Sequence, residues 1–416
     1  MTLGEIVDKF RVWGFRGILN FVFRFFSNRR HARVLACLAK ASKGTKPSRG
    51  ITVIADVSSQ VSLSKTMRDF ILSLRDVGIP VQVYDTSRTS EIPLSDAAGM
   101  TTPIEDFNLR RYDHIVMMYR SPLDERLVPD IKCSRIAFHE SNHGIDQTAP
   151  YLKESGDAII AMSDFNCHYY KRTFSSQPVF KIVYPLRFVR HDGTPRDMLR
   201  VKYGIGVDDF VVFFNFDFGS YYRKNPIAAI KAFAKAFHDV PKAKLVFKTK
   251  NAKAYPKRAS EMEHAAAVAG IKEKFIHIAD YLPRADINGL TNACDVYLSL
   301  HKSEGFGLGM AEAMSCGKPV VATDWSANTE FCHADTSWPV PYSMTPILPH
   351  EYMATMVEWA DADIDAAARC LREIYDGPEK AAARAACGQK FMIEHFSLAN
   401  FKASVEAFLN GEEVCA

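Results

Sequence analysis

The sequence predicts an α/β protein made of two doubly wound, Rossmann-like domains that face a cleft. Short runs of β-branched and apolar residues alternate with helical patterns from residue 51 onward, as in parallel sheets covered by helices on both faces. The alternation restarts at residue 208, after a stretch that has neither pattern. The chain of 416 residues is also long enough for two domains of ordinary size.

In the first alternating region, a helix is predicted directly after the first strand. Its sequence, LSKTMRDFILSLRDVG at 63–78, has a helical apolar pattern and ends at a glycine, which suits the end of a helix. Five short apolar runs are predicted strands: 51–57, 80–85, 114–119, 135–140 and 158–163.

The second alternating region repeats this arrangement. Its predicted strands are 208–217, 243–249, 274–280, 295–300 and 319–323, and its predicted helices are 225–240, 285–294 and 309–316. Ligands of doubly wound sheets bind beyond the carboxyl ends of the strands. Candidate functional residues are therefore expected in the loops that follow these strands.

The composition excludes several classes of protein. The formal net charge of +4 is small for this length, so a nucleic-acid partner is not predicted. The nine cysteines include no C-x-x-C pair, and a zinc site is therefore not indicated. No run reaches the roughly 18 uncharged apolar residues of a transmembrane helix. We expect a cytoplasmic protein.

The N-terminal segment has a different character from the rest of the chain. Apolar and aromatic residues recur at helical spacing between residues 3 and 25, and six arginines between 11 and 33 lie beside them. Such a helix suits an anionic membrane surface, which residues 1–33 would contact at the inner face of the cytoplasmic membrane. Docking of the same apolar face on protein remains an equal alternative, because periodicity does not reveal what covers it.

The most informative stretch is EGFGLGMAE at 304–312. It follows a predicted strand, and its glycines allow a tight turn before a run of strong helix formers. A helix that begins there presents free backbone N–H groups to a diphosphate. Glu304 and Glu312 are acceptors suited to sugar and ribose hydroxyls, which indicates a nucleotide sugar rather than ATP.

Taken alone, this stretch has a simpler explanation. It could be an ordinary strand-to-helix turn with a solvated glutamate on either side. The dinucleotide fingerprint G-x-G-x-x-G is not met, because Met310 occupies its last place, and no Walker ending G-K-[ST] occurs.

The surrounding residues resemble a known family. Glu304 and Glu312, followed by AMSCGKPVVAT, are similar to the E-x7-E signature of glycosyltransferase family 4, which has the GT-B fold. The stretch FDFGSYYRKNPIAAIKAFAKAF at 216–237 resembles the R-K-N-P branch of bacterial polysaccharide glycosyltransferases. The resemblance covers most of 203–345 and is looser over 51–190.

The resemblance implies a role for each matching residue. Lys224, with Arg223 as a second candidate, would neutralise the donor diphosphate and stabilise its departure. Glu304 would contact the hydroxyls of the donor sugar, and Glu312 those of the ribose. The residues alone also favour Lys224, because it begins a helix directly after a strand, although a polar loop is the alternative.

The turn itself would hold the phosphates. By the same resemblance, the backbone amides of Phe306, Gly307 and Leu308 would cradle them. Enzymes of this kind transfer sugar with retained configuration, and the leaving phosphate accepts the proton of the acceptor.

Two groups of candidates lie in the N-terminal domain. The family often has a histidine that faces the donor sugar where His139 stands, and Glu140 matches an acidic residue of the R-K-N-P branch. A structural role is the alternative for a lone histidine. The family's glycine-rich loop after the first strand is absent, and Ser64, Lys65 and Arg68 could replace it on the acceptor side.

The resemblance also implies an organisation of the chain. We expect a helical segment at 1–48, an acceptor-side domain at 49–190, a nucleotide-sugar domain at 196–380 and a helix at 381–416 that crosses back to the first domain. The DADID stretch at 361–365 is interpreted as a solvated helix start rather than a metal motif. No metal or other cofactor is predicted.

The function implied is transfer of a hexose from a nucleotide-diphosphate sugar to a growing, lipid-linked cell-surface glycan. Family habit favours a guanine-nucleotide donor such as GDP-mannose. Two alternatives stay open: a nucleotide-sugar epimerase or hydrolase of the same fold, and a non-catalytic scaffold that binds a partner.

Overall fold

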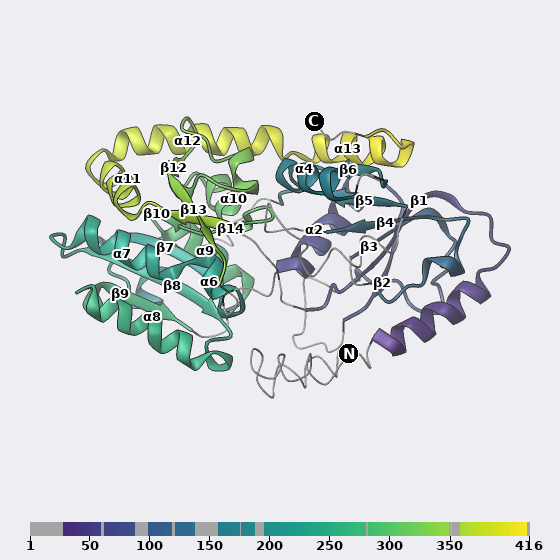
Figure 1. Ribbon diagram of the computed structural model, residues 1–416, viewed down its shortest axis with the longest axis horizontal. Helices are drawn as coiled ribbons and strands as arrows, with labels where there is room; N and C mark the ends of the chain where they lie inside the picture. Colours follow the sequence, from purple (N-terminus) through teal and green to yellow (C-terminus); the bar gives the residue numbers. More distant parts are fainter. Residues whose placement is uncertain are drawn as a thin grey trace. The chain divides into compact units, whose positions relative to one another are not determined.

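The computed structural model describes residues 28–59, 62–87, 99–118, 121–137, 157–174, 176–187, 195–279, 282–348, 351 and 358–413. These residues form two compact units, coloured along the sequence in Figure 1. Described residues within 28–137, 157–185 and 398–413 make up the first unit, and those within 186–397 make up the second.

The first unit is built on a parallel sheet of six strands in the order β2-β1-β3-β4-β5-β6. This confirms the predicted parallel sheet. The strands are β1 (Ser48–Ala55), β2 (Val81–Asp85), β3 (Tyr112–Met118), β4 (Lys132–Ile136), β5 (Ala158–Ala161) and β6 (Val179–Lys181); the helices are 28–41, α2 (Ser62–Asp76), α4 (Asp164–Thr173) and α13 (Leu398–Asn410).

The N-terminal and C-terminal helices of the first unit are both packed on its sheet. In helix 28–41, Leu35 and Ala39 are buried with Ile54 of β1 in one apolar cluster. In α13, Phe401 contacts Phe70 of α2 edge-on, with ring centroids 5.7 Å apart. Apolar and aromatic contacts thus join both helices to the first unit.

The structure adds detail to two of the segments expected from the sequence. Helix 28–41, within the helical segment expected at 1–48, is part of the first unit. Its described part is joined to the unit because Leu35 is fully buried against the sheet. The apolar residues between 3 and 25 lie outside the described residues.

The expected helix 381–416 is two helices that belong to different units. Helix α12 (Pro378–His395) belongs to the second unit and α13 to the first. The first of them ends at Phe396, whose ring packs on Phe306 and Phe331 with centroids 5.6 and 5.9 Å apart. A buried ring at this position anchors the chain, and a new helix begins two residues later.

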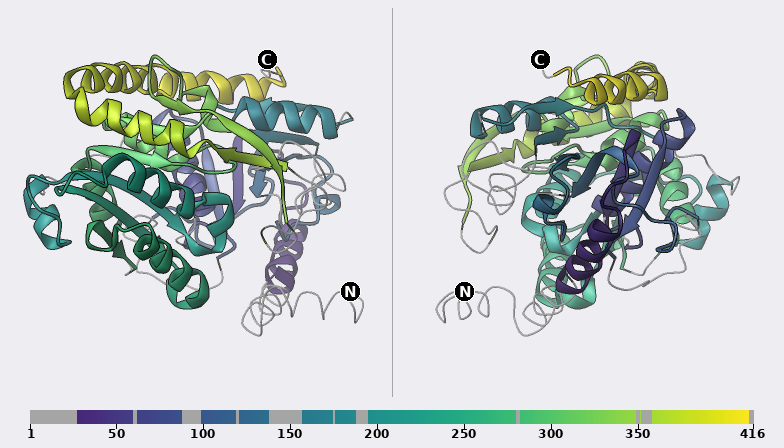
Figure 2. Two further views of the ribbon diagram at one scale, coloured as in Figure 1. Left: turned by 60° about the vertical axis from the view of Figure 1, so that its left-hand side comes forward. Right: turned by 90° about the vertical axis from the view of Figure 1, so that its right-hand side faces the viewer.

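The second unit has its own parallel six-stranded sheet, in the order β12-β11-β10-β7-β8-β9. Its strands are β7 (Phe210–Asp217), β8 (Ala243–Lys250), β9 (Phe275–Ile278), β10 (Val296–Ser299), β11 (Val320–Thr323) and β12 (Trp338–Val340), with a separate antiparallel pair β13 (Tyr342–Pro346) and β14 (Glu358–Ala362). Its helices are α5 (Arg196–Lys202), α6 (Tyr221–Lys224), α7 (Pro226–Phe237), α8 (Pro256–Val268), α9 (Arg284–Ala293), α10 (Leu308–Ser315), α11 (Ile364–Asp376) and α12. Figure 2 shows α11 and α12 side by side at the yellow-green end of the colour scale.

The strand order of the second unit defines where a ligand can bind. Chain order runs outward from β7 through β8 to β9 on one side, and from β10 through β11 to β12 on the other. This is the order of dinucleotide-binding sheets, in which ligands occupy the point where the direction reverses. Here that point lies between β7 and β10.

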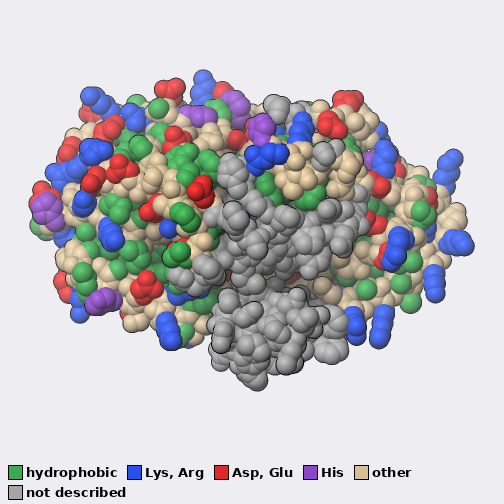
Figure 3. All heavy atoms as spheres, viewed as in Figure 1, with side chains coloured by type: hydrophobic (Ala, Val, Ile, Leu, Met, Phe, Trp, Pro, Cys, Tyr) green, Lys and Arg blue, Asp and Glu red, His purple; other side chains and the backbone are tan. Residues whose placement is uncertain are grey.

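The described surface carries a mixture of charges. On the face shown in Figure 3, lysine and arginine side chains are interspersed with aspartate and glutamate. This pattern agrees with the small net charge of +4. Among the described residues, helices that combine the length and the apolar character needed to cross a membrane are absent.

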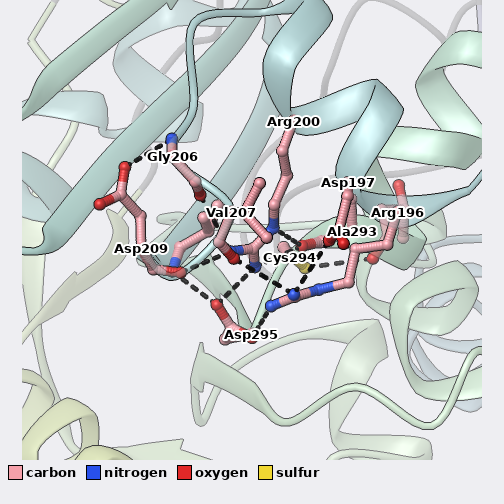
Figure 4. A network of polar contacts seen from close by, with 11 residues as sticks. Arg196, Asp197, Arg200, Gly206, Val207, Asp209, Ala293, Cys294 and Asp295 are labelled. Atoms are coloured by element: carbon pink, nitrogen blue, oxygen red, sulfur yellow. Dashed lines mark hydrogen bonds and ion pairs between the residues drawn. The ribbon is translucent and has the colours of Figure 1, made fainter.

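A buried arginine holds the start of the second unit to its sheet. Arg200 of α5 is fully buried and lies within 2.8 Å of Asp295, which precedes β10 (Figure 4). Its guanidinium also donates to the backbone carbonyls of Ala293 and Asp209. Arg196 reaches the same carboxylate at 3.1 Å, but its side chain is 44% exposed.

We expect Arg200→Met to lower the free energy of unfolding by roughly 3 kcal/mol, because it leaves a carboxylate and several carbonyls without their donor. Arg196→Met removes an exposed partner of the same carboxylate and is expected to change the free energy by about 1 kcal/mol or less. Urea denaturation followed by circular dichroism measures both variants. Equal losses of free energy of unfolding in the two variants would contradict a larger contribution from the buried arginine.

Candidate functional site

Two loops meet at the reversal point of the second sheet. After β7 the chain continues through Phe218–Ser220 into α6, and after β10 it continues into the loop 300–307. The N–H of Lys302 donates to the carbonyl of Arg223 at 2.7 Å. The Arg223 guanidinium donates in return to the carbonyl of Ser303 at 2.8 Å. These bonds place the R-K-N-P stretch against the E-x7-E stretch.

Glu304 lies between two cations in this site. Arg223 Nη1 is 3.2 Å from one carboxylate oxygen, and Lys224 Nζ donates to the other. The residue is only 6% exposed, so burial alone would raise the pKa of the carboxyl group. Lys224 and Arg223 outweigh burial and lower this pKa to about 2. Glu304 is therefore ionised at neutral pH, and three sequence-predicted residues converge at one point.

Lys224 is held at the end of a short helix by the residue that follows it. Asn225 has a left-handed backbone with φ of 53°, which asparagine tolerates well, and it separates α6 from α7. Pro226 then opens α7 at a position where no backbone donor is needed. The Asn225 amide lies 3.4 Å from Asp361, the first acid of the DADID stretch.

The second acid of that stretch has a structural role. Asp363 caps α11, because its carboxylate accepts the N–H groups of Asp365 and Ala366 at 2.9 and 3.0 Å. Among the described residues, no three His, Cys, Asp or Glu side chains are grouped so that they could hold a metal ion.

Two glycines of the motif are needed for the backbone conformation and for close packing of the helix. Gly307 has φ of 97°, a region that favours glycine, and it forms the turn into α10. A Cβ on Gly309 would lie 2.1 Å from Tyr297 Oη, so only glycine lets α10 sit this close to the sheet. Tyr297 in turn donates to Asn215 of β7 at 2.8 Å. The start of α10 is thereby pressed against the strands at the reversal point.

The first turn of α10 offers an anion site. Helix geometry leaves the amides of Leu308 and Gly309 without an intrahelical carbonyl, and the positive end of the helix dipole points the same way. The preceding residue, Phe306, is buried with its ring packed on Phe331, centroids 5.5 Å apart. The packing of Phe306 on Phe331 thus fixes the turn that carries the predicted phosphate-binding amides.

Glu312 has a partner that sequence analysis did not single out. Arg284, the first residue of α9, forms an ion pair with the Glu312 carboxylate. Glu312 is 5% exposed, whereas the Arg284 side chain is 34% exposed. The only sequence signal for Arg284 is its position directly after a proline at a helix start. Its distance of 28 residues from Glu312 hides the pairing.

A buried histidine beside the charged cluster was also missed. His301 is fully buried, and burial lowers its pKa to about 3, so the imidazole is neutral. Among the described residues, neither ring nitrogen meets hydrogen-bond geometry with a partner, although Asn328 lies near enough to raise the pKa weakly. Its backbone carbonyl accepts the Thr323 hydroxyl at 2.6 Å.

The acceptor-side candidates Ser64, Lys65 and Arg68 follow β1, and two of them form hydrogen bonds with the loop between β1 and α2. Arg68 donates to the carbonyls of Val57 and Ser59 at 2.9 and 2.8 Å. Ser64 Oγ is 2.8 Å from Ser59 Oγ, and Lys65 pairs with an aspartate one turn later on α2. These side chains therefore stabilise the loop that lacks glycine. His139 and Glu140 lie outside the described residues.

Comparison with known proteins agrees with this geometry. A family model described as glycosyl transferases group 1 matches residues 196–336. A stretch of 71 residues is 35% identical to the lipopolysaccharide core biosynthesis mannosyltransferase LpsB of Rhizobium meliloti strain 1021. That match covers 17% of this chain and 19% of LpsB, so the chain spans about a fifth of the length of this relative.

Solved structures resemble the chain over most of its length. Anabaena HepE, in complex with UDP and glucose, is 15% identical with a TM-score of 0.64, covering 88% of this chain and 100% of that one. Sucrose-phosphate synthase from Thermosynechococcus elongatus is 15% identical with a TM-score of 0.65, covering 88% and 99%. WaaG, a glycosyltransferase involved in lipopolysaccharide biosynthesis, is 13% identical with a TM-score of 0.59, covering 87% and 100%.

These likenesses confirm the fold class predicted from the sequence. The chain has the GT-B glycosyltransferase fold, with two parallel six-stranded sheets covered by helices. Its second unit carries a domain that matches group 1 glycosyl transferases and contains the cluster of Arg223, Lys224 and Glu304.

The lowered pKa of Glu304 predicts a pH-dependent stability. An ordinary glutamate in the unfolded chain has a pKa of about 4.5, so a folded-state pKa of about 2 stabilises the fold above pH 4.5. This contribution, roughly 3 kcal/mol at pH 7, is lost as the pH falls from about 4.5 through 2. We expect the wild type to exceed Glu304→Gln in free energy of unfolding at pH 7. The difference should shrink at pH 3, and a constant difference between pH 7 and pH 3 would contradict the charge pairing.

Proposed function

We propose that this protein is a retaining glycosyltransferase that moves a hexose from a nucleotide-diphosphate sugar to a glycan acceptor. The observation that carries this proposal is the convergence of Arg223, Lys224 and Glu304 beside the start of α10. Two cations and a helix N-terminus suit a diphosphate, and a buried carboxylate suits sugar hydroxyls. The matches to group 1 glycosyl transferases and to LpsB support it.

The diphosphate would compete with Glu304 for its two cations. Without donor, Arg223 and Lys224 balance the charge of the Glu304 carboxylate. A bound diphosphate would attract the same cations and leave carboxylate lone pairs to accept sugar hydroxyls. Lys224 would then stabilise the charge that develops on the leaving phosphate, a contribution largest in the transition state.

The remaining donor contacts follow from the helix start. The amides of Phe306, Gly307 and Leu308 are proposed to bind phosphate oxygens. Glu312 is proposed to accept ribose hydroxyls, with Arg284 holding its carboxylate in place. His139 is proposed to contact the donor sugar, and Glu140, Ser64, Lys65 and Arg68 are proposed to serve the acceptor side.

The proposed reaction exchanges one bond to the anomeric carbon for another on the same face. The bond from that carbon to the donor phosphate oxygen breaks, and a bond to the acceptor oxygen forms. The proton of the acceptor hydroxyl passes to the leaving phosphate oxygen. Because Arg223 and Lys224 supply the positive charge, the proposal needs no metal ion or other cofactor.

The sugar and the acceptor are proposed from the chain's relatives and its N-terminus. LpsB is described as a mannosyltransferase of lipopolysaccharide core biosynthesis, and WaaG acts in lipopolysaccharide biosynthesis. We propose mannose as the hexose, GDP-mannose as the donor and a lipid-linked cell-surface glycan as the acceptor. Residues 1–33 would place the enzyme peripherally at the cytoplasmic membrane face.

A panel of nucleotides tests the donor site directly. We expect GDP to raise the melting temperature most among UDP, GDP, ADP and TDP, since a ligand at a hundred times its Kd stabilises a fold by about 2.7 kcal/mol. Glu312→Ala should reduce this shift, because the ribose loses its acceptor. Glu304→Ala should keep nucleotide binding and lose sugar transfer.

The outcomes of this panel are distinct. A shift with UDP alone would replace GDP-mannose by a uridine donor. The absence of a shift with all four nucleotides would contradict the nucleotide-sugar site as a whole. Product analysis with donor alone separates a transferase, which needs its acceptor, from an epimerase or hydrolase.

Removal of residues 1–30 tests the membrane placement. We expect the truncated protein to lose binding to vesicles that contain anionic lipid and to turn over a lipid-linked acceptor more slowly, because it lacks the basic amphipathic segment. Turnover of a water-soluble acceptor should be preserved. Vesicle sedimentation and product assays measure both, and unchanged vesicle binding would refute this role of the segment.

A further inference from the structure

Ser326 has a backbone conformation that serine rarely adopts. It lies in the loop after β11 with φ of 72° and ψ of −158°, a region used almost only by glycine. Among the described residues, the other non-glycine residues with positive φ are Asn225 and Asn251, and asparagine tolerates such angles better. A glycine at position 326 would take up this conformation without strain. We therefore expect the serine side chain to have a role that glycine cannot supply.

The Ser326 hydroxyl contacts the backbone of Glu304. Its Oγ accepts the Glu304 N–H at 2.8 Å, and the next residue, Ala327, donates its N–H to the Glu304 carbonyl at 3.2 Å. Ser326 is 3% exposed, so water is a poor substitute for its hydroxyl. Both polar backbone groups of Glu304 are thus held by the loop after β11.

The loop that carries Ser326 is itself tied to neighbouring strands. Asn328 donates its side-chain amide to the carbonyl of Thr323 at the end of β11, at 2.9 Å. The hydroxyl of Thr329 donates to the carbonyl of Ser326 at 2.8 Å. Thr323 reaches across to the carbonyl of His301. The loop can therefore act as a rigid support for the stretch 301–304.

We propose that Ser326 is a positioning residue for Glu304: its strained backbone aims the hydroxyl at the Glu304 amide and so sets where the carboxylate stands. The inference rests on the proposed function, in which Glu304 contacts the donor sugar. Glycine in this place would remove the strain but also the hydroxyl. Serine keeps the hydroxyl that holds Glu304 in place, although its backbone at position 326 is strained.

Two substitutions at position 326 separate strain from positioning. Ser326→Ala removes the hydroxyl and keeps a strained side chain, whereas Ser326→Gly removes both the hydroxyl and the strain. We expect kcat for sugar transfer to fall about tenfold or more in both, as displacement of a reacting group predicts. The KM for the donor should change by no more than about threefold, because the phosphate contacts remain. The melting temperature of Ser326→Gly should exceed that of Ser326→Ala by about 2 °C or more.

A serine elsewhere provides the matched control. Ser404 of α13 is also buried, and its Oγ accepts the N–H of Val183 at 3.1 Å in the first unit. Ser404→Ala should lower the melting temperature and leave kcat unchanged. Positioning predicts that Ser326→Gly keeps its melting temperature but has a lower kcat. It also predicts that Ser404→Ala has a lower melting temperature but an unchanged kcat. A general loss of stability would instead lower both quantities together.

The alternative results overturn the inference in different ways. If the wild type transfers sugar and Ser326→Gly has the same kcat, the hydroxyl does not position Glu304. If Ser326→Gly melts below Ser326→Ala, the backbone at 326 is not strained in the way proposed. A wild type that neither binds nucleotides nor transfers sugar overturns the proposed function, and this inference with it.

Discussion

The site depends on the pairing of one buried carboxylate with two cations. Glu304 can stay ionised at 6% exposure only because Arg223 and Lys224 outweigh the effect of burial. The three charges come from two loops, so their pairing also joins those loops at the reversal point of the sheet. In the proposed function, a diphosphate would meet positive charge that is already assembled and would compete with this carboxylate for it. Donor binding and the release of Glu304 for the sugar would then be coupled by electrostatics.

The strand order explains why this charge cluster and a helix start occupy the same place. In the second sheet β7 and β10 are neighbours, so the chain leaves their carboxyl ends in opposite directions. Gly309 lets α10 approach Tyr297 and Asn215 at this reversal point. The first amides of the helix and the cations after β7 consequently lie at the same end of the sheet, where one ligand is proposed to bind both.

The sequence allowed the fold class and the central residues to be predicted because both depend on local patterns. Alternating strands and helices indicate a doubly wound sheet, and Glu304 and Glu312 stand in one short motif. Arg284 and Ser326 escaped notice for physical reasons. The partner of Arg284 lies on another helix, and the positive φ of Ser326 depends on the loop around it.

The same reasoning applies to elements whose limits depend on tertiary contacts. The division between α12 and α13 depends on the aromatic contacts of Phe396, which no local pattern reveals. Edge strand β12 was not predicted either, because a three-residue strand with a proline at its centre has little periodicity. His139 and Glu140 lie outside the described residues and stay predictions.

The place of α13 in the first unit has a consequence for how the chain is made. The described residues of the second unit all lie within 186–397, whereas those of the first unit lie both before and after that stretch. Phe401 of α13 packs on Phe70 of α2 and Phe408 packs on Phe180 of β6, and both phenylalanines follow the whole second unit in the chain. Domains otherwise tend to fold in the order of synthesis. Here the unit that is begun first is completed only after the other has been fully translated.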